Sequence, residues 1–268
     1  MNLNEIYQGD CALLMQELLP NIVDLTVTSP PYGDLRSYTG YSLDFEDLAA
    51  SLYRVTKTGG VVVWVVGDET NDGSESGDSF RQVLNFVDLG FNLHDTMIYD
   101  KDCFRFPFSN RYHQVFEYMF VLSKGKPKTF NPIRDRLVLH SHDNRKQHIK
   151  RKVDGSFTYR KSFLDAKHSK RYNIWRYSPG AGKSTLDAFA FEHPAIFPEA
   201  LAADHIRSWS NPGDLVLDPM CGSGTTCKMA KILGRRFLGF DISAEYVALA
   251  QRRIAGVPLS LPFENLTT

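Results

Sequence analysis

The segment GDLVLDPMCGSGTTCKMAKILGRRFLGFDIS, residues 213–243, constrains the fold of this chain more than any other. An apolar run that ends at Asp218 predicts a buried strand, and the small residues after it predict a tight loop. Helical spacing then continues to about Leu233, where Gly234 can end the helix, and a second apolar run ends in Asp241. The segment therefore predicts two parallel strands joined by a helix.

The same alternation extends over most of the chain. Apolar runs at 24–28 and 61–66 have the length and composition of buried parallel strands, and 94–99 and 115–123 are candidates for paired edge strands. Apolar residues at helical spacing lie between the runs: Leu48, Leu52 and Val55 before Gly59-Gly60, Val83, Leu84 and Val87 before Gly90, and a further pattern over 194–209. Alternating strands and helices predict an α/β fold with a doubly wound sheet covered on both faces.

Length and composition limit the protein class. The 268 residues, 43% of them apolar, suffice for one large α/β domain or for one domain with an insertion. No apolar run approaches the roughly 18–20 residues of a membrane span, and the first residues do not resemble a secretion signal. The four cysteines form no CxxC pair, and the eight histidines show no metal-ligand spacing. We therefore expect a cytoplasmic protein without a metal or disulfides.

Charge is distributed unevenly along the chain. The formal net charge is zero, yet residues 126–183 hold 16 Lys and Arg against four Asp, and the rest of the chain carries the opposite excess. Such asymmetry indicates a basic surface for a polyanion. A solvated, partly disordered loop is the alternative, although interleaved aromatic residues argue against it. The irregular stretch 126–190 is interpreted as an insertion between two parts of one domain, 1–125 and 191–268.

The glycine loop at 221–226 indicates a nucleotide-like ligand, with an ordinary strand–helix turn as the alternative. Glycines allow close backbone approach, and Asp241 at the next strand end can accept hydrogen bonds from both ribose hydroxyls. Cys227 replaces the third glycine of a dinucleotide fingerprint. The carboxylate of Asp218, followed by Pro219, would repel a pyrophosphate but attract an α-ammonium group. This pattern favours S-adenosylmethionine over NAD.

A second glycine motif, GAGKST at 180–185, resembles the end of a phosphate-binding loop. The full pattern needs a glycine five residues before Gly182, where this chain has Tyr177, and no buried strand leads into the motif. A flexible basic hinge is the better interpretation.

The sequence TVTSPPYGD, residues 26–34, ends a predicted strand in two prolines, which cannot donate to a sheet ladder. Taken alone, this corner is a turn. Together with DPMCGSGTT (218–226) before a helix, SPPY resembles the exocyclic-amino DNA methyltransferases, and specifically the permuted β group, in which the catalytic motif precedes the cofactor motif. The resemblance covers most of the chain, because YQGDC (7–11), HPAIFP (193–198) and FLGFDIS (237–243) follow the family's order.

The resemblance implies a Rossmann-like methyltransferase fold, S-adenosylmethionine as cofactor, and a target-recognition role for the basic insertion. YQGDC is similar to the family's adenine-binding element, and HPAIFP to the segment under the cofactor's methionine end. The implied cofactor contacts are Asp10, Cys11, Phe197, Asp218, Met220, Cys221, Gly222, Ser223, Gly224, Thr225, Thr226, Asp241 and Ile242. Met220 departs from the pattern, because an aromatic residue is usual there.

The implied catalytic residues are Ser29, Pro30, Pro31 and Tyr32. An exocyclic amino nitrogen is a poor nucleophile, because its lone pair is delocalised into the ring. The Ser29 hydroxyl and the Pro30 carbonyl can accept its two N–H groups, and the stiff prolines preorganise these acceptors. Tyr32 offers a ring on which a flipped base can stack. No Pro-Cys dipeptide is present, so a covalent route to a ring carbon is not predicted.

The expected partner is duplex DNA, with no membrane and no metal, and a cognate restriction endonuclease is implied by resemblance only. Arg36 and Tyr38 could close over the flipped base or lie in a surface loop. The acidic run from Asp68 to Asp78 is interpreted as a solvated loop, although Asp68 could line the pocket. Predicted DNA contacts are Arg36, Tyr38, Arg145, Lys146, Lys150, Arg151 and Lys152.

The predicted product is N4-methylcytosine, because in the resembling family serine before Pro-Pro-Tyr accompanies cytosine more often, whereas Asp or Asn accompanies adenine. Methylation of adenine's amino group is the first alternative. An RNA or protein-glutamine methyltransferase and an inactive DNA-binding module are further alternatives.

Overall fold

The structure is a computed structural model that describes residues 1–31, 44–103, 109–137, 147–161 and 168–257. The chain forms two compact units. The larger one comprises Met1–Asn131 and Asn173–Thr268, and the smaller one Pro132–Tyr172.

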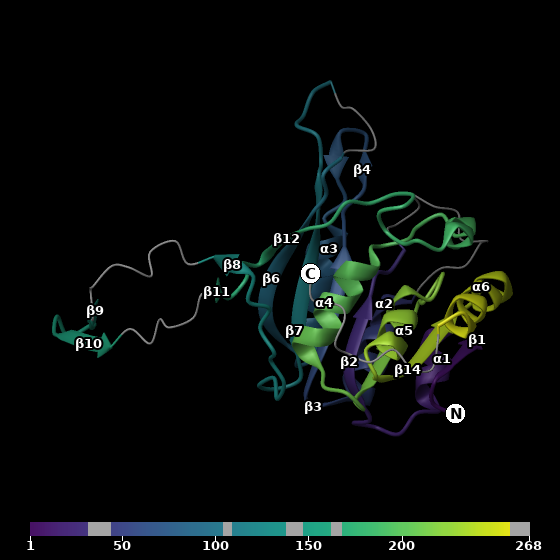
Figure 1. Cartoon of the computed structure of the whole chain (residues 1–268), viewed down its shortest axis with the longest axis horizontal. Coiled ribbons are helices and arrows are strands. Elements are labelled where there is room, and N and C mark those ends of the chain that lie inside the picture. The colour runs from purple at the N-terminus through teal and green to yellow at the C-terminus, as the bar shows by residue number, and fades with distance from the viewer. Residues whose placement is uncertain (32–43, 104–108, 138–146, 162–167, 258–268) are drawn as a thin grey trace. The chain divides into compact units, whose positions relative to one another are not determined.

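The larger unit contains an eight-stranded sheet in the order β1-β14-β13-β2-β3-β7-β6-β12 (Figure 1). In that order the strands are β1 (Glu5–Gln8), β14 (Arg236–Asp241), β13 (Leu215–Asp218), β2 (Val23–Thr28), β3 (Thr56–Val66), β7 (Phe116–Ser123), β6 (Asn92–Asp100) and β12 (Ile174–Arg176). The first five run parallel, β7 is antiparallel to both neighbours, and β12 is parallel to β6. The predicted α/β doubly wound sheet is confirmed.

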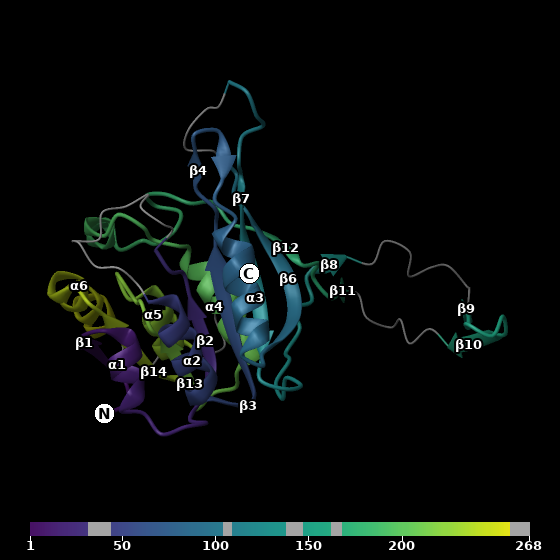
Figure 2. The ribbon, with the colours of Figure 1, turned by 180° about the vertical axis from the view of Figure 1, so that it is seen from behind.

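Helices cover both faces of this sheet (Figures 1 and 2). One face carries α1 (Cys11–Gln16), α2 (Phe45–Val55) and α3 (Asp78–Asp88), and the other carries α4 (Glu199–Trp209), α5 (Thr225–Ile232) and α6 (Ala244–Ala255). The helical spacing of α2 buries Leu48, Leu52 and Val55 completely. In the same core cluster, Trp64 of β3 is fully buried and donates its indole N–H to Gln82 at 2.8 Å. Apolar burial of this kind is the main stabilising contribution to the fold.

Two predicted details are wrong. Strands β6 and β7 pair as expected, but β6 is not an edge, because β12 from the predicted insertion lies outside it. Helix α2 ends at Val55, before Gly59-Gly60, and these glycines belong to β3. A side chain on Gly60 would place its Cβ 3.0 Å from the Asp24 carbonyl oxygen, so the glycine allows β2 and β3 to approach.

Short elements complete the described chain. In the larger unit, β4 (Thr70–Asn71) and β5 (Ser74–Glu75) form a hairpin, and η1 (Ala188–Glu192) is a 3₁₀ helix. The smaller unit contains two antiparallel pairs, β8 (Arg136–Leu137) with β11 (His168–Ser169) and β9 (Gln147–Arg151) with β10 (Phe157–Lys161). Within the part of the chain that the structure describes, no helix has the length and apolar character needed to cross a membrane.

Gly239 of β14 provides a test of the packing between the sheet and its helices. A Cβ there would overlap Ile6 Cδ1 and lie 2.8 Å from Cys227 Sγ. We expect Gly239→Ala to lower the free energy of unfolding by about 1–3 kcal/mol, because the core must shift to admit the methyl group. The control is Gly256→Ala, where φ is −69° and the nearest atom lies 3.5 Å away. Urea unfolding that gives equal losses for both variants would contradict this packing.

Candidate active site

The predicted site residues gather at one edge of the sheet, where the five parallel strands end. Asp10 follows β1, Asp241 ends β14, Asp218 ends β13, Ser29 follows β2, and Asp68 lies just beyond β3. Because parallel neighbouring strands share a direction, their carboxyl ends lie side by side, which is where α/β sheets bind ligands. The fold thus brings together motifs that are almost 200 positions apart in sequence.

Hydrogen bonds connect the loops along this edge. The Cys221 N–H donates to the Phe240 carbonyl oxygen at 2.8 Å, which ties the glycine loop to β14. The Thr28 hydroxyl, at the end of β2, donates to Asp218 Oδ1 at 2.8 Å. Thr28, just before the Ser29-Pro30 corner, is therefore bonded directly to Asp218, the last residue of the strand that leads into the glycine loop.

Asp241 holds the glycine loop in position. Its Oδ2 accepts the Gly222 N–H at 2.8 Å and its Oδ1 accepts the Ser243 N–H at 2.9 Å. Burial raises the pKa of this carboxyl, although the two N–H donors oppose that effect. Gly222 has a φ of +47°, and a Cβ on it would lie 2.7 Å from His193 Nε2. A side chain is therefore excluded at the centre of the loop.

Asp218 is a buried acid whose pKa is raised far above that of an exposed carboxyl. It is 2% exposed, and burial raises its pKa to about 7, although the Thr28 hydroxyl lowers it. A cation placed beside this carboxyl would lower its pKa and be held by it. The position can therefore recognise a positively charged group at neutral pH.

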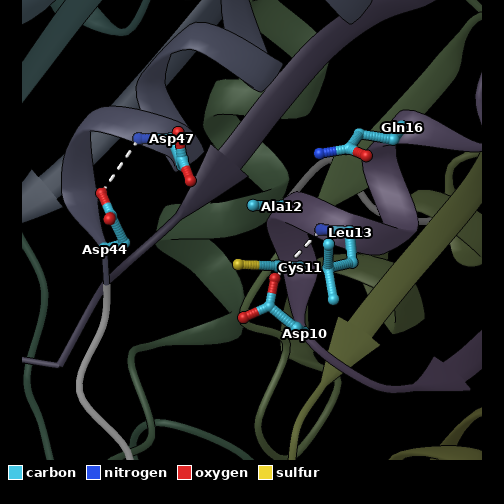
Figure 3. A pocket seen from close by; sticks show the side chains of 7 residues that line it. All are labelled: Asp10, Cys11, Ala12, Leu13, Gln16, Asp44 and Asp47. Carbon is cyan, nitrogen blue, oxygen red and sulfur yellow. Dashed lines mark hydrogen bonds between the residues drawn. The ribbon is translucent and has the colours of Figure 1, made fainter.

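The predicted adenine-binding element borders a pocket of about 230 Å³ lined by Asp10, Cys11, Ala12, Leu13, Gln16, Asp44 and Asp47. Figure 3 shows that the first turns of α1 and α2 face this pocket. Asp10 caps α1 by accepting the Leu13 N–H at 3.0 Å, and Asp44 caps α2 by accepting the Asp47 N–H at 3.1 Å. Burial raises the pKa of Cys11 to about 12, so its thiol stays neutral.

The remaining predicted cofactor residues lie in or near the same loops. Phe197 is half-buried just before α4, Met220 is half-buried against the core, and Ile242 is exposed directly after Asp241. Cys221, Ser223, Thr225 and Thr226 are buried, and Gly224 is the N-cap residue of α5, with a φ of +78°. Burial holds the pKa of the Cys221 thiol well above its usual range, which fits a small apolar role.

The predicted catalytic corner is described as far as Pro31. Ser29 and Pro31 are half-buried and Pro30 is buried, at the end of β2. Tyr32, Arg36 and Tyr38 lie outside the described residues. Their predicted roles stay predictions.

The predicted DNA contacts of the insertion belong to the smaller unit. Lys152 is exposed in the turn between β9 and β10, where its N–H donates to the Ser156 carbonyl oxygen at 2.7 Å. Lys150 and Arg151 lie in β9. Arg145 and Lys146 lie outside the described residues.

The interpretation of the acidic run as a solvated loop is wrong for two of its residues. Asp68 and Glu69 are 7% and 6% exposed. The Asp68 carboxylate accepts the Ser79 N–H at 2.9 Å and so caps the first turn of α3, which explains its burial. The described residues, those of the acidic run included, contain no group of three or more His, Cys, Asp or Glu placed to hold a metal ion.

A set of charged residues beside the glycine loop was not predicted from the sequence: Asp187, Glu199, Lys228 and Arg253. Arg253 is 2% exposed in α6. A sequence signal exists, because Arg253 falls at helical spacing on the same face as the buried Val247, Ala250 and Ile254. An arginine on an apolar helix face implies buried acceptors.

The pKa of Asp218 predicts how stability depends on pH. The unfolded chain releases this proton near pH 4, whereas the folded chain keeps it until about pH 7. The carboxyl therefore contributes stability at low pH that is lost as the pH rises from 4 to 7. Asp218→Asn mimics the protonated acid, so wild type should lose stability relative to this variant by at most about 1.4 kcal/mol per pH unit. Denaturant unfolding from pH 5 to pH 8 measures this, and a pH-independent difference would contradict it.

Known proteins share both the sequence and the fold. The family N6_N4_Mtase, described as DNA methylase, matches residues 23–252. The orphan methyltransferase M.BamHII of Bacillus amyloliquefaciens is 60% identical over 250 residues, which cover 92% of this chain and 90% of the relative.

Two solved structures have the same fold. The PvuII DNA methyltransferase, named as cytosine-N4-specific, has a TM-score of 0.66 at 21% identity and covers 96% of this chain and 87% of its own. A DNA modification methylase of Thermus thermophilus, solved with S-adenosylmethionine, has a TM-score of 0.62 at 23% identity and covers 94% and 93%. The family match over most of the chain and the 60% identical relative identify the protein as a DNA methyltransferase of the family that modifies exocyclic amino nitrogens.

Proposed function

We propose that this protein transfers a methyl group from S-adenosylmethionine to the N4 amino nitrogen of cytosine in duplex DNA. One observation carries the proposal: the bond from Thr28 to Asp218 joins the ends of the two neighbouring strands that lead into the Ser29-Pro30 corner and the glycine loop. Hydrogen-bond acceptors for an amino group therefore lie next to the loop that the resemblance assigns to the cofactor.

The described residues fit S-adenosylmethionine. Gly222 has a φ of +47°, which lets the loop turn at this point, and His193 lies where a side chain on this residue would stand. Asp241 Oδ1 and Oδ2 each accept one N–H and keep a lone pair for a ribose hydroxyl. Asp10 uses Oδ1 to cap α1, and its other oxygen can accept the adenine amino group. When bound, S-adenosylmethionine supplies an electrophilic methyl group on a sulfonium.

Asp218 fits the amino-acid end of that molecule. Its buried carboxyl, with a pKa of about 7, can pair with an α-ammonium group. Ionisation of Asp218 is then favoured by the ligand's charge, so binding releases a proton when the pH lies below about 7.

The chain's own residues would prepare the target nitrogen for attack. The Ser29 hydroxyl and the Pro30 carbonyl accept its two N–H groups, which draws the nitrogen toward a tetrahedral geometry and exposes its lone pair. The corner needs little reorganisation, because Pro30 is buried and the two prolines restrict the backbone. The transfer would be direct, with no covalent bond between the base and the protein: the nitrogen–methyl bond would form as the sulfur–methyl bond breaks, the sulfur would leave as a neutral thioether, and the nitrogen would release one proton to solvent.

Serine at position 29 favours cytosine over adenine in this proposal. A hydroxymethyl group is shorter than the side chains of Asp and Asn, and its hydroxyl rotates to accept from the amino group. The resembling enzymes with serine at this position act more often on cytosine. Adenine methylation remains the competing outcome of the experiment below.

The DNA would be held largely by the basic insertion, whose smaller unit is Pro132–Tyr172. Lysines and arginines bind phosphates and release counterions, which fixes the position of the duplex without reading its sequence. The target cytosine must leave the stack, because its amino group inside a duplex cannot meet the methyl group in line. A cognate restriction endonuclease stays a prediction of the resemblance.

The identity of the methylated nucleoside tests the proposal. Incubation with labelled S-adenosylmethionine and mixed-sequence duplex DNA should give labelled DNA, and hydrolysis to nucleosides should give N4-methyldeoxycytidine by mass spectrometry. RNA and a protein extract serve as competing substrates. Methyldeoxyadenosine without methyldeoxycytidine would contradict the cytosine assignment, and label in RNA or protein alone would contradict the proposed substrate.

Ser29→Ala tests the catalytic corner. We expect kcat to fall by about 100-fold or more, because the lost acceptor acts mainly in the transition state. Binding of DNA and of S-adenosylmethionine should change by less than about threefold. Ser29→Thr keeps the hydroxyl and should retain more activity than the alanine variant. An equal loss in both variants, or a loss of cofactor affinity alone, would place the role of Ser29 outside catalysis.

A further inference from the structure

A buried cluster of charges lies beside the glycine loop and is centred on Arg253. The Arg253 side chain is 0% exposed and uses all three of its nitrogens. Nη1 donates to Ser223 O at 2.8 Å, to Ser223 Oγ at 3.0 Å and to Thr225 Oγ1 at 3.1 Å. Arg253 thus contacts the loop at Ser223 and Thr225, whereas the Asp241 carboxylate contacts it at Gly222.

The other nitrogens of Arg253 reach segments that are distant in sequence. Nη2 donates to Glu199 Oε1 at 2.7 Å and to Thr185 Oγ1 at 3.3 Å, and Nε donates to Asp187 Oδ2 at 3.0 Å. Lys228 bridges the same two carboxylates, at 2.7 Å each. Thr185, the last residue of GAGKST, is therefore buried in this cluster.

The charges of the cluster balance. Two cations face two carboxylates, and Lys228 and Arg253 lower the pKa of Asp187 even though burial opposes this. A buried arginine is tolerated only when its donors are satisfied, and a change at one member leaves the others unpaired. The cluster therefore has one well-defined arrangement, which fixes Ser223 relative to α4 and α6.

We propose that Arg253 is a positioning residue for cofactor binding, which holds the glycine loop in its ligand-accepting shape and couples that shape to residues 184–199. The proposal rests on the proposed function of the loop. The Gly222 N–H is bonded to Asp241, and the carbonyl of the adjacent Ser223 is bonded to Arg253. These two groups belong to the peptide units on either side of the Gly222–Ser223 peptide, so the two bonds together limit the rotation of the loop backbone more than one of them would.

Lysine cannot replace this arginine. A guanidinium presents five N–H donors in a planar fork, whereas an ammonium has three donors at one point. Arg253→Lys keeps the charge but loses simultaneous contact with Ser223, Thr185 and Asp187. We expect its dissociation constant for S-adenosylmethionine to rise by at least about tenfold.

The experiment compares Arg253→Lys with Arg235→Lys. Arg235 is 8% exposed and donates to Ser210 Oγ at 3.0 Å, Ser210 O at 2.7 Å and Leu233 O at 2.6 Å, none of them in the glycine loop. Both changes should lower stability, but only Arg253→Lys should weaken cofactor binding in calorimetry. Hydrogen exchange without cofactor should also show faster exchange at residues 222–226 in Arg253→Lys alone.

Binding within twofold of wild type in folded Arg253→Lys, or equal weakening in Arg235→Lys, would overturn the proposal. If Arg253→Lys does not fold, Asp187→Asn serves as a second variant, because it removes one charge of the cluster. It should weaken cofactor binding by about threefold or more. Unchanged binding in this variant would also overturn the proposal. The proposed function is tested separately, because wild-type protein that binds S-adenosylmethionine without methylating cytosine would contradict that function and leave the comparison of variants intact.

Discussion

The parallel alignment of β1, β14, β13, β2 and β3 is the constraint on which the site depends. Strands that run in one direction end at one edge, so the loops that follow them must meet there. Hydrogen bonds then fix these loops to one another, as between Thr28 and Asp218 and between Gly222 and Asp241. A strand inserted between β13 and β2 would separate the Ser29-Pro30 corner from the glycine loop, whatever their sequences.

Local patterns predicted the parts of the fold that local chemistry controls. The strand ending at Asp218, the loop glycines and the helix starting at Thr225 follow from apolar runs and small residues, and the structure contains all three. Contacts between distant segments were not predictable in this way. Strand β12 has only three residues and joins the sheet by pairing with β6, which no pattern within 174–176 indicates. Asp68 is likewise one of several acids in a polar run, and nothing in that run indicates its bond to the Ser79 N–H.

The site combines two kinds of carboxylate with opposite tasks. Asp241 is bonded by two backbone N–H groups and acts as a fixed acceptor. Asp218 is almost fully buried and poised near neutral pH, so its charge depends on what lies beside it. Arg253 pairs with Asp187 and Glu199, whereas the described hydrogen bonds of Asp218 come from the uncharged Thr28 hydroxyl and Met220 N–H. In the proposed function, the ligand's ammonium group would supply the cation beside Asp218.

The two residues that flank the smaller unit are both anchored in the larger one. Asn131 donates its N–H to the Ser208 carbonyl oxygen at 2.8 Å and its side-chain amide to the Arg207 carbonyl oxygen at 3.1 Å. Asn173 accepts the Ile98 N–H at 2.9 Å and donates to the Thr96 carbonyl oxygen at 3.1 Å. The described residues of Pro132–Tyr172 contribute no strand to the eight-stranded sheet, and the residues on either side of this unit are held by the larger one. The length and sequence of 132–172 can therefore change while the strand order of the larger unit stays the same.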